Sequence, residues 1–229
     1  MSERQGLPIR AVFLGAPGAG KGTQAKDLVA AYRTLHISSG DMLREHRQKG
    51  TELGIEAEKF MNDGKLVPDD LIIKMVIDRI QQPDATESWI LDGFPRTVQQ
   101  AQSLDQNLEQ NSGPDGGLSH VVYFEVPHEI LVRRLTGRRT CSGCGAIWHT
   151  EFKPTAKEGV CDACGGELTQ RADDTAEVAE RRLQEYRSLT EPLLDYYRSA
   201  NVLVTVSADQ EPAAVFEQLV SKLKSREPA

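Results

Sequence analysis

The residues best suited to chemistry form a glycine-rich run from Gly15 to Thr23, with the sequence GAPGAGKGT. Glycines at positions 15, 18, 20 and 22 let the chain curl tightly enough to aim several backbone N–H groups at one anion. Within the G-x-x-x-x-G-K core, Lys21 is placed to neutralise the β- and γ-phosphates of a nucleotide, and Thr23 offers a hydroxyl near Mg²⁺. The alternative is a plain glycine-rich turn with a solvated lysine, which the preceding apolar strand and the following helical pattern disfavour. The loop therefore predicts an enzyme that moves a phosphoryl group out of ATP.

The cysteines form a second candidate site, because all four of them fall between positions 141 and 164. They are arranged as two C-x2-C pairs separated by 16 residues, which fits a zinc ion held by four thiolates. Such a site has no open position for water, so we expect the metal to be structural. The alternative is that the four cysteines are buried and free, and iron is an alternative to zinc as the metal. His149 is a conceivable further ligand, but we expect it to be an ordinary residue of this stretch. The predicted ligands are Cys141, Cys144, Cys161 and Cys164.

A third group of residues follows an apolar strand, in the segment Leu91 to Arg96 with the sequence LDGFPR. Ligands of open parallel sheets bind at the carboxyl ends of the strands, beside the phosphate loop. Asp92 is therefore a candidate for the Mg²⁺ shell, acting through water, with capping of the turn as its alternative role. Arg96 is a candidate clamp for a second phosphate, since arginine binds phosphate oxygens in a bidentate manner. Further arginines suited to this task are Arg44, Arg138, Arg171 and Arg182.

Length and composition limit the classes of protein to consider. The chain has 229 residues, of which 27% are charged and 39% hydrophobic, and its formal net charge is −7. This balance fits one large domain or a core that carries inserts, and it disfavours nucleic acid as a partner. No apolar run approaches the ~18 residues that a membrane span needs, and the N-terminal segment MSERQGLPIR lacks the apolar stretch of a signal peptide. We expect a cytoplasmic monomer without membrane or nucleic-acid partners.

Short apolar strands alternate with helical patterns, and this order predicts an α/β fold in which helices cover both faces of a five-stranded parallel sheet. Two stretches interrupt the alternation: residues 39–68 place helices where a direct crossover is due, and residues 137–174 lack a long helix. The expected strands are residues 9–14, 35–38, 89–91, 120–126 and 202–206. The expected helices are residues 21–33, 41–48, 54–62, 69–81, 98–111, 128–135, 212–224, and 175–200 with a break or bend at Pro192. A surface loop is expected over residues 111–117.

These motifs occur in the order seen in adenylate kinases, and the chain resembles the long, lidded form of that family over almost its whole length. The resemblance rests on the loop at 15–23, on SGDMLR at 39–44, on DGFPR at 92–96 and on GRR at 137–139. It implies a P-loop CORE domain formed by residues 1–37, 68–136 and 175–229. Residues 38–67 would form an NMP-binding insert, and residues 137–174 a LID that carries the zinc site. Hinge candidates at the ends of the LID are Gly137 and residues 173–175.

The same resemblance assigns nucleotide contacts to single residues. The implied ATP contacts are Gly18, Ala19, Gly20, Lys21, Gly22, Thr23, Arg138, Ile147, Trp148 and Gln210. The implied AMP contacts are Ser39, Arg44, Lys65, Leu66, Val67, Gly93, Phe94, Pro95, Arg96, Gln100, Arg171 and Arg182. Ser39 departs from the threonine of many relatives but keeps the hydroxyl, and Ile147-Trp148 departs from their valine-tyrosine or similar pair. The implied catalytic residues, which stabilise charge during transfer, are Lys21, Arg96, Arg138, Arg171 and Arg182.

The reaction implied by the resemblance is ATP + AMP ⇌ 2 ADP with Mg²⁺, a direct in-line transfer without a covalent enzyme intermediate that serves nucleotide homeostasis. A kinase for GTP:AMP or for UMP/CMP is the nearer alternative, against which Gln100 and Ser39 favour AMP by resemblance. A zinc-ribbon nucleic-acid-binding module on an NTPase core is the more distant one. Residues 137–174 hold five Lys/Arg against six Asp/Glu, whereas a binder of phosphate backbones should show a basic excess.

Overall fold

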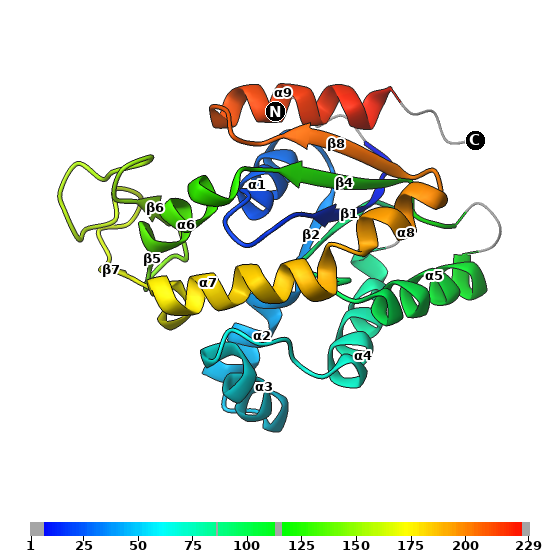
Figure 1. Cartoon of the computed structure of the whole chain (residues 1–229), viewed down its shortest axis with the longest axis horizontal. Helices are drawn as coiled ribbons and strands as arrows, with labels where there is room; N and C mark the ends of the chain where they lie inside the picture. Colours follow the sequence, from blue (N-terminus) through cyan, green and yellow to red (C-terminus); the bar gives the residue numbers. More distant parts are fainter. Residues whose placement is uncertain (1–6, 86, 113–115, 226–229) are drawn as a thin grey trace.

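The computed structural model describes residues 7–85, 87–112 and 116–225. Five of its strands are β1 (Arg10–Leu14), β2 (Leu35–Ser38), β3 (Trp89–Asp92), β4 (His120–Glu125) and β8 (Leu203–Ser207). They form one parallel sheet in the order β2-β3-β1-β4-β8 (Figure 1). Val12 of the central strand lies opposite Leu91 on one side and Val121 on the other. Continuous apolar runs suit these strands, because a central parallel strand is buried on both faces. The predicted α/β fold with a five-stranded parallel sheet is confirmed.

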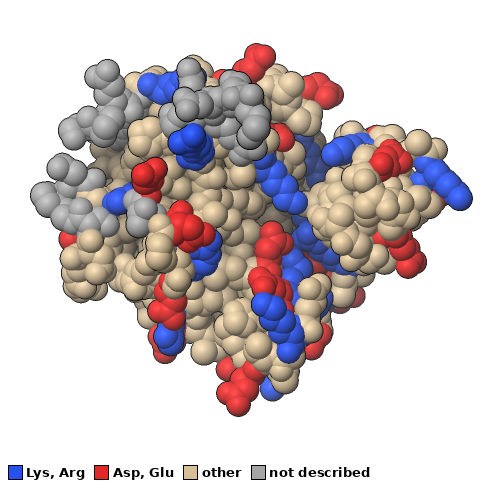
Figure 2. All heavy atoms as spheres, turned by 180° about the vertical axis from the view of Figure 1, so that it is seen from behind, with Lys and Arg blue, Asp and Glu red and all other residues tan. Residues whose placement is uncertain are grey.

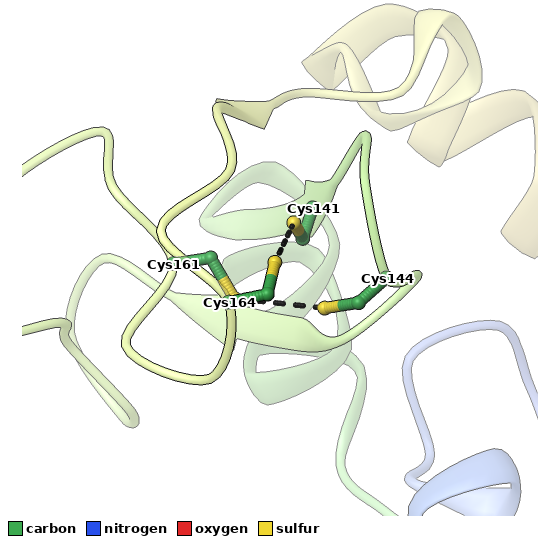
Figure 3. A group of neighbouring side chains, drawn as sticks. All are labelled: Cys141, Cys144, Cys161 and Cys164. Atoms are coloured by element: carbon green, nitrogen blue, oxygen red, sulfur yellow. Dashed lines mark hydrogen bonds between the residues drawn. The ribbon is translucent and has the colours of Figure 1, made fainter.

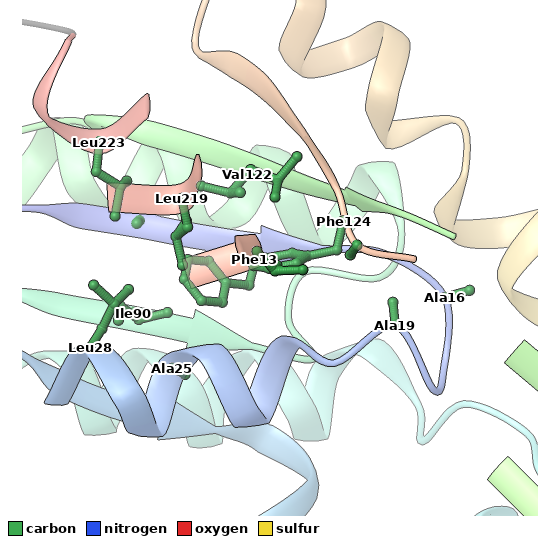
Figure 4. Packing of buried hydrophobic residues seen from close by; sticks show 14 of the residues in the cluster. Phe13, Ala16, Ala19, Ala25, Leu28, Ile90, Val122, Phe124, Leu219 and Leu223 are labelled. Atoms are coloured by element: carbon green, nitrogen blue, oxygen red, sulfur yellow. The ribbon is translucent and has the colours of Figure 1, made fainter. Parts of the chain in front are cut away.

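Helices cover both faces of this sheet, as predicted. They include α1 (Lys21–Ala31) and α9 (Pro212–Lys224) on one face, and α4 (Asp69–Ile80), α5 (Val98–Ser112) and α8 (Leu193–Ser199) on the other. Successive residues of β1 point to opposite faces, so Phe13 packs with α1 and α9 whereas Val12 packs with α4 and α5. On the first face, the ring centroids of Phe13 and Phe124 lie 4.9 Å apart, close to Leu219 of α9 (Figure 4).

The long helix expected over residues 175–200 is divided in three. Its first part is α7 (Ala176–Glu185), which follows the N-cap Thr175 and packs against α6 (His128–Thr136). A π-helical segment, η3 (Tyr186–Thr190), then precedes Pro192 and α8, and the N–H of Glu191 donates to the carbonyl of Tyr186 at 2.9 Å. The change from an α-helix to a wider π-helix has a physical cause: proline has no N–H, and its ring clashes with the carbonyl four residues earlier. The break therefore begins before Pro192 and not at it.

Two helices make up most of the helical insert, as we call residues 38–67. Helix α2 (Ser39–Gln48) and helix α3 (Glu52–Asn62) are capped by the side chains of Ser38 and Thr51, which accept hydrogen bonds from backbone N–H groups three residues later. The two helices touch closely at Gly54, where a Cβ atom would collide with the backbone of His46. Both helices begin two residues earlier than expected from the sequence.

A small antiparallel sheet organises the cysteine insert, as we call residues 137–174. Its strands β5 (Arg138–Cys141), β6 (Ile147–His149) and β7 (Leu168–Thr169) lie in the order β6-β5-β7, and a 3-10 turn, η2 (Ala172–Asp174), leads into α7. The sequence predicted the absence of a long helix here, but it did not predict these strands. One further 3-10 turn, η1 (Pro83–Ala85), precedes β3.

Some expectations fall at the margins of the described chain. Of the surface loop expected at 111–117, residues 111 and 112 end α5, and residues 113–115 lie outside the described residues. Residues 1–6 of the N-terminal segment also lie outside them. Within the described part of the chain, no helix has the length and apolar character needed to cross a bilayer.

Candidate functional site

The glycine-rich run forms a tight loop between β1 and α1. Gly15, Gly18 and Gly20 have φ angles of 144°, 85° and 90°, a region that residues with a Cβ rarely adopt. Gly22 already lies in α1, and a Cβ there would come within 3.2 Å of a carboxylate oxygen of Asp92. The loop thus ends at the N-terminus of α1, where backbone N–H groups and the helix dipole favour an anion.

Lys21 is the first residue of α1, and its side chain turns back to the loop. Its Nζ donates to the carbonyls of Gly15 at 2.7 Å and Ala16 at 3.0 Å. Burial lowers the pKa of Lys21 to about 8, and repulsion by Arg96 adds to this effect, while Asp92 opposes it. A phosphate bound beside Lys21 would favour the protonated lysine, because an opposite charge nearby raises the pKa of an amine.

The loop opens into a cavity of about 1070 Å³, at the upper end of the range for small-molecule sites. Figure 2 shows a cleft between the body of the molecule and a smaller lobe, with Lys and Arg side chains gathered along it. Most predicted nucleotide contacts line this cavity: Gly18, Ala19, Gly20, Lys21, Gly22, Thr23, Ser39, Arg44, Lys65, Leu66, Val67, Gly93, Pro95, Arg96, Gln100, Arg138, Ile147, Trp148, Arg171, Arg182 and Gln210. Phe94 differs, because its side chain is buried in the core with residues of α4 and α5.

Five predicted arginines converge on the cavity, and burial lowers the pKa of three of them, Arg96, Arg171 and Arg182. Burial, followed by the charge of Arg182, lowers the pKa of Arg96 to about 10. Burial, followed by the charge of Arg138, lowers the pKa of Arg171 to about 10. The fully buried carboxylate of Asp174 accepts hydrogen bonds from Arg138 at 2.7 and 2.5 Å and from Arg182 at 3.1 Å. The excess of positive charge that remains makes this cavity a place for a polyanion.

Asp92 lies where β3 ends, next to the phosphate loop. Its Oδ2 is 3.4 Å from Nε2 of His36 on the neighbouring strand β2. Burial by itself would raise the pKa of Asp92, but the hydrogen bond from His36 and the charge of Lys21 outweigh burial and lower that pKa. The carboxylate is thus held ionised beside the loop, which suits a role near a hydrated cation.

On the side of the helical insert, polar groups are already paired with one another. The hydroxyl of Ser39 donates to the carbonyl of Gly93 at 2.8 Å. Gln100 accepts from the backbone N–H of Arg96 at 2.7 Å and donates to Asp69 at 2.6 Å. These bonds fix the side chain of Gln100 at the cavity wall and use one N–H and one oxygen lone pair of its amide. The amide has a second N–H and a second lone pair with which to contact a base edge. Arg44 Nη2 lies 2.5 Å from Asp41 Oδ1.

The segment 65–67 lies between α3 and α4 at the end of the helical insert. Lys65 is exposed and lies 3.8 Å from a carboxylate oxygen of Asp63, whereas Val67 is buried. The backbone N–H of Leu66 donates to Glu185 of α7 at 3.2 Å. The segment is therefore held along the cavity by the burial of Val67 and by the hydrogen bond of Leu66 to α7.

Across the cavity, Ile147 and Trp148 lie on β6 and Gln210 lies in the loop after β8. Lys153 Nζ is 4.7 Å from the ring centroid of Trp148, a cation–π contact. The loop that carries Gln210 is tied down on both sides, because Arg134 donates to the carbonyl of Ala208 at 2.8 Å and Gln24 donates to that of Pro212 at 3.0 Å.

The four cysteines meet at the tip of the cysteine insert, and their Sγ atoms all lie within 4.8 Å of one another (Figure 3). The Cys141–Cys164 and Cys144–Cys161 sulfur distances are 3.4 and 3.7 Å, too long for disulfides. A tetrahedral zinc ion with Zn–S bonds of about 2.3 Å would space its sulfurs roughly 3.8 Å apart. The donor set therefore fits a four-thiolate zinc site.

The two cysteine turns are built alike, as the glycines after them suggested. The carbonyls of Cys141 and Cys161 accept from the N–H groups of Gly145 and Gly165 at 3.0 and 2.8 Å, and both glycines have positive φ. His149 is not part of the cluster. Its Nδ1 accepts from the backbone N–H groups of residues 151 and 152, and its Nε2 lies 3.1 Å from the carbonyl of Arg133.

Several residues that shape the site were not identified from the sequence. Asp174 appeared there only as part of a hinge region, yet it pairs with two cavity arginines, and Asp173 lies 2.9 Å from Arg182. Thr190 of the π-helical segment donates to the carbonyl of Arg96 at 2.9 Å. For the two aspartates a signal was available, because Asp173 and Asp174 are adjacent acids close to Arg171 in the sequence. For Thr190 the neighbouring residues gave no indication of its contact with Arg96.

Comparison with known proteins gives one consistent answer. The adenylate kinase family model matches residues 13–202. The chain is 48% identical to the adenylate kinase of Desulfitobacterium hafniense strain DCB-2 over 94% of its length and 98% of that protein. It is 48% identical to that of Clostridioides difficile strain 630, over 95% of this chain and 99% of the relative. It is 44% identical to the adenylate kinase of Clostridium perfringens strain 13, over 96% of this chain and 99% of the relative. The chain belongs to the adenylate kinase family.

Proposed function

We propose that the protein transfers the terminal phosphoryl group of ATP to AMP, giving two ADP. The observation that carries this proposal is one cavity in which a phosphate loop and five arginines converge from three parts of the chain. That arrangement suits two phosphate chains placed end to end, and family membership names the nucleotides. A GTP:AMP or UMP/CMP kinase is not favoured, because the relatives are adenylate kinases.

We assign the donor to the phosphate loop and the acceptor to the helical insert. ATP would be bound by residues 18–23, Arg138 and Gln210, with its base covered by Ile147 and Trp148. AMP would be bound by Ser39, Arg44, residues 65–67, residues 93–96 and Gln100, with Arg171 and Arg182 between the two nucleotides. Residues 38–67 and 137–174 would act as an AMP-binding insert and a lid on a CORE formed by the remaining residues.

The chemistry asks the protein for positioning and charge. An oxygen of the AMP phosphate attacks the γ-phosphorus directly, so no side chain needs to act as nucleophile. Lys21, Arg96, Arg138, Arg171 and Arg182 would stabilise the negative charge that spreads over the transferred group. Mg²⁺ bound to ATP supplies charge neutralisation at the β- and γ-phosphates, and Asp92 would hold its hydration shell. Closure of the lid would exclude water and so suppress hydrolysis of ATP.

Zinc would hold the cysteine insert through Cys141, Cys144, Cys161 and Cys164. Thiolates kept available for a metal suit a reducing compartment, in keeping with a cytoplasmic location. We expect the protein to act as a monomer.

A coupled assay tests the proposal most directly, with AMP, GMP, CMP and UMP as acceptors and ATP and GTP as donors. We expect AMP with ATP to give the highest kcat/KM. Another acceptor that exceeded AMP by more than about tenfold, a difference of about 1.4 kcal/mol, would overturn the assignment.

Arg96 offers a sharper test of the mechanism. Its guanidinium is buried beside the cavity, so Arg96→Ala should lower kcat by roughly 10²-fold or more, as loss of one preorganised donor does. Arg79→Ala is a matched control, because Arg79 pairs with the exposed Asp84 away from the cavity and should leave kcat unchanged. A near-normal kcat in Arg96→Ala would exclude the proposed role.

A further inference from the structure

Trp148 is the residue in the described chain that connects the cysteine cluster to the cavity by a side-chain hydrogen bond. Its indole lines the cavity, and its Nε1–H donates to Sγ of Cys161 at 3.3 Å. The backbones of Trp148 and Cys161 are held in place independently of that side-chain bond. Trp148 pairs with Arg139 across the β5–β6 ladder, while the backbone N–H of Cys161 donates to Gly166 at 2.9 Å.

The chemistry of the two groups makes this bond specific. The indole N–H is a donor with no acceptor capacity, so it cannot itself bind the metal or compete for it. A zinc-bound cysteine is a thiolate, and hydrogen bonds to an ionised acceptor are stronger than those between neutral groups. Groups that donate to metal ligands orient those ligands and commonly change metal affinity by 10–100-fold. Lys153 over the ring withdraws electron density from the indole and so strengthens its N–H as a donor.

We propose that the Trp148–Cys161 hydrogen bond couples the metal site to the donor-nucleotide site. The metal would hold the Cys161 thiolate in place, the thiolate would fix the indole, and the indole would present a preset face to the base of ATP. Because such coupling is reciprocal, a bound base should in turn slow the loss of metal. The nucleotide half of this inference rests on the proposed function of Trp148. The N–H···S half does not.

Trp148→Phe separates the two halves, since phenylalanine keeps an aromatic face and removes the donor. Phe152→Leu is the matched control, because Phe152 is a half-exposed aromatic residue of the same insert whose side chain has no N–H donor and whose ring packs on that of His149, with centroids 4.6 Å apart. The first measurement is the rate at which zinc-loaded protein releases metal to an excess of a chromogenic chelator, without nucleotide. We expect about tenfold faster release from Trp148→Phe and an unchanged rate from Phe152→Leu.

A spectroscopic measurement reports on the sulfur directly. In the cobalt-substituted protein, loss of a hydrogen bond to a thiolate raises the energy of its lone pairs and moves the sulfur-to-cobalt charge-transfer band to longer wavelength. We expect that shift in Trp148→Phe and not in Phe152→Leu. If release rate and band position in Trp148→Phe both match those of the unaltered protein, the hydrogen bond has no role and the proposal fails.

The coupling is tested by repeating the release assay with Mg²⁺-ATP and, separately, with Mg²⁺-tripolyphosphate, which has the phosphates but no base. In the unaltered protein ATP should slow release more than tripolyphosphate does, and in Trp148→Phe the two should be alike. Equal protection by the two ligands in the unaltered protein, or the same extra protection by ATP in both proteins, overturns the coupling. The KM for ATP of Trp148→Ala, which removes the aromatic face as well as the donor, tests the base-covering role: an unchanged KM refutes that role. Turnover of ATP and AMP by the unaltered enzyme tests the overall function independently.

Discussion

The two inserts of this molecule flank the same cavity but are held together by different physics. The helical insert, 30 residues long, buries Leu43, Ala57 and Val67 against one another and the core. The cysteine insert, 38 residues long, buries no apolar side chain apart from Cys141 and Cys161. A segment of that size cannot bury enough apolar surface to stay folded by itself. Packing thus stabilises one insert, whereas we propose that a metal bound by the four cysteines stabilises the other.

Removal of the metal should produce the largest difference in stability between the two inserts. The apparent binding free energy of a structural zinc ion is of order 10 kcal/mol, so chelation should unfold the cysteine insert and leave the helical insert intact. Limited proteolysis followed by mass spectrometry should then show new cleavage within residues 137–174 and none within residues 38–67. We also expect thermal stability to fall more than turnover at low temperature. A metal-free protein that melted and was cleaved like the holo form would disprove this account.

Asp174 should have the next largest effect, at the base of the cysteine insert. Its fully buried carboxylate forms ion pairs with Arg138 and Arg182, and Asp174→Ala removes the negative charge from both pairs. Loss of one member of a buried ion pair costs about 3–5 kcal/mol, which denaturant unfolding would detect. Asp84→Ala, which removes an exposed partner of Arg79, should leave the unfolding free energy nearly unchanged. Equal losses of unfolding free energy in the two variants would mean that the ion pairs of Asp174 do not stabilise the base of the cysteine insert.

A change at Gly54 tests the packing of the helical insert. A Cβ there would collide with the backbone of α2, so Gly54→Ala should destabilise the protein by about 1–3 kcal/mol, although alanine favours helices. Gly117→Ala is the control, because a Cβ at Gly117 meets no atom within 4 Å. Zinc content should remain unchanged in both variants. Loss of zinc from Gly54→Ala would show that the two inserts are not independent.

The smallest effect is a pH dependence confined to the cysteine insert. Burial lowers the pKa of His149 from 6.5, so the folded state binds fewer protons than the unfolded chain. Its stabilising contribution is therefore complete above pH 6.5 and is lost as the pH falls through the lowered pKa. Amide exchange in residues 137–174 should accelerate over that range. His149→Gln, which offers one donor and one acceptor but does not titrate, should flatten this part of the profile; an identical profile would assign it to other groups.

Much of the site could be predicted because its signals are local. A loop such as Gly15 to Thr23 needs glycines and a lysine at fixed spacing, and two C-x2-C pairs carry their own ligand geometry. The placement of Arg44, Arg96 and Arg138 on the cavity followed from the order of motifs and the family they resemble. The boundaries of elements were predicted less accurately, since α2 and α3 both begin two residues earlier than expected. The helix after Thr175 was predicted as one element with a break or bend, because the π-helical segment has no sequence signature apart from Pro192.

By itself, therefore, the sequence determined the phosphate loop, the two pairs of cysteines and the alternation that builds a parallel sheet, because each depends on residues close together in the chain. Only the tertiary structure decided which acids balance the arginines. It also decided that Gly54 sits against α2 and that the Trp148 N–H meets the Cys161 sulfur. Those contacts join residues separated by 8 to 36 positions, and they depend on how whole elements pack against one another. Local pattern fixes which groups are present, and long-range packing fixes which of them meet.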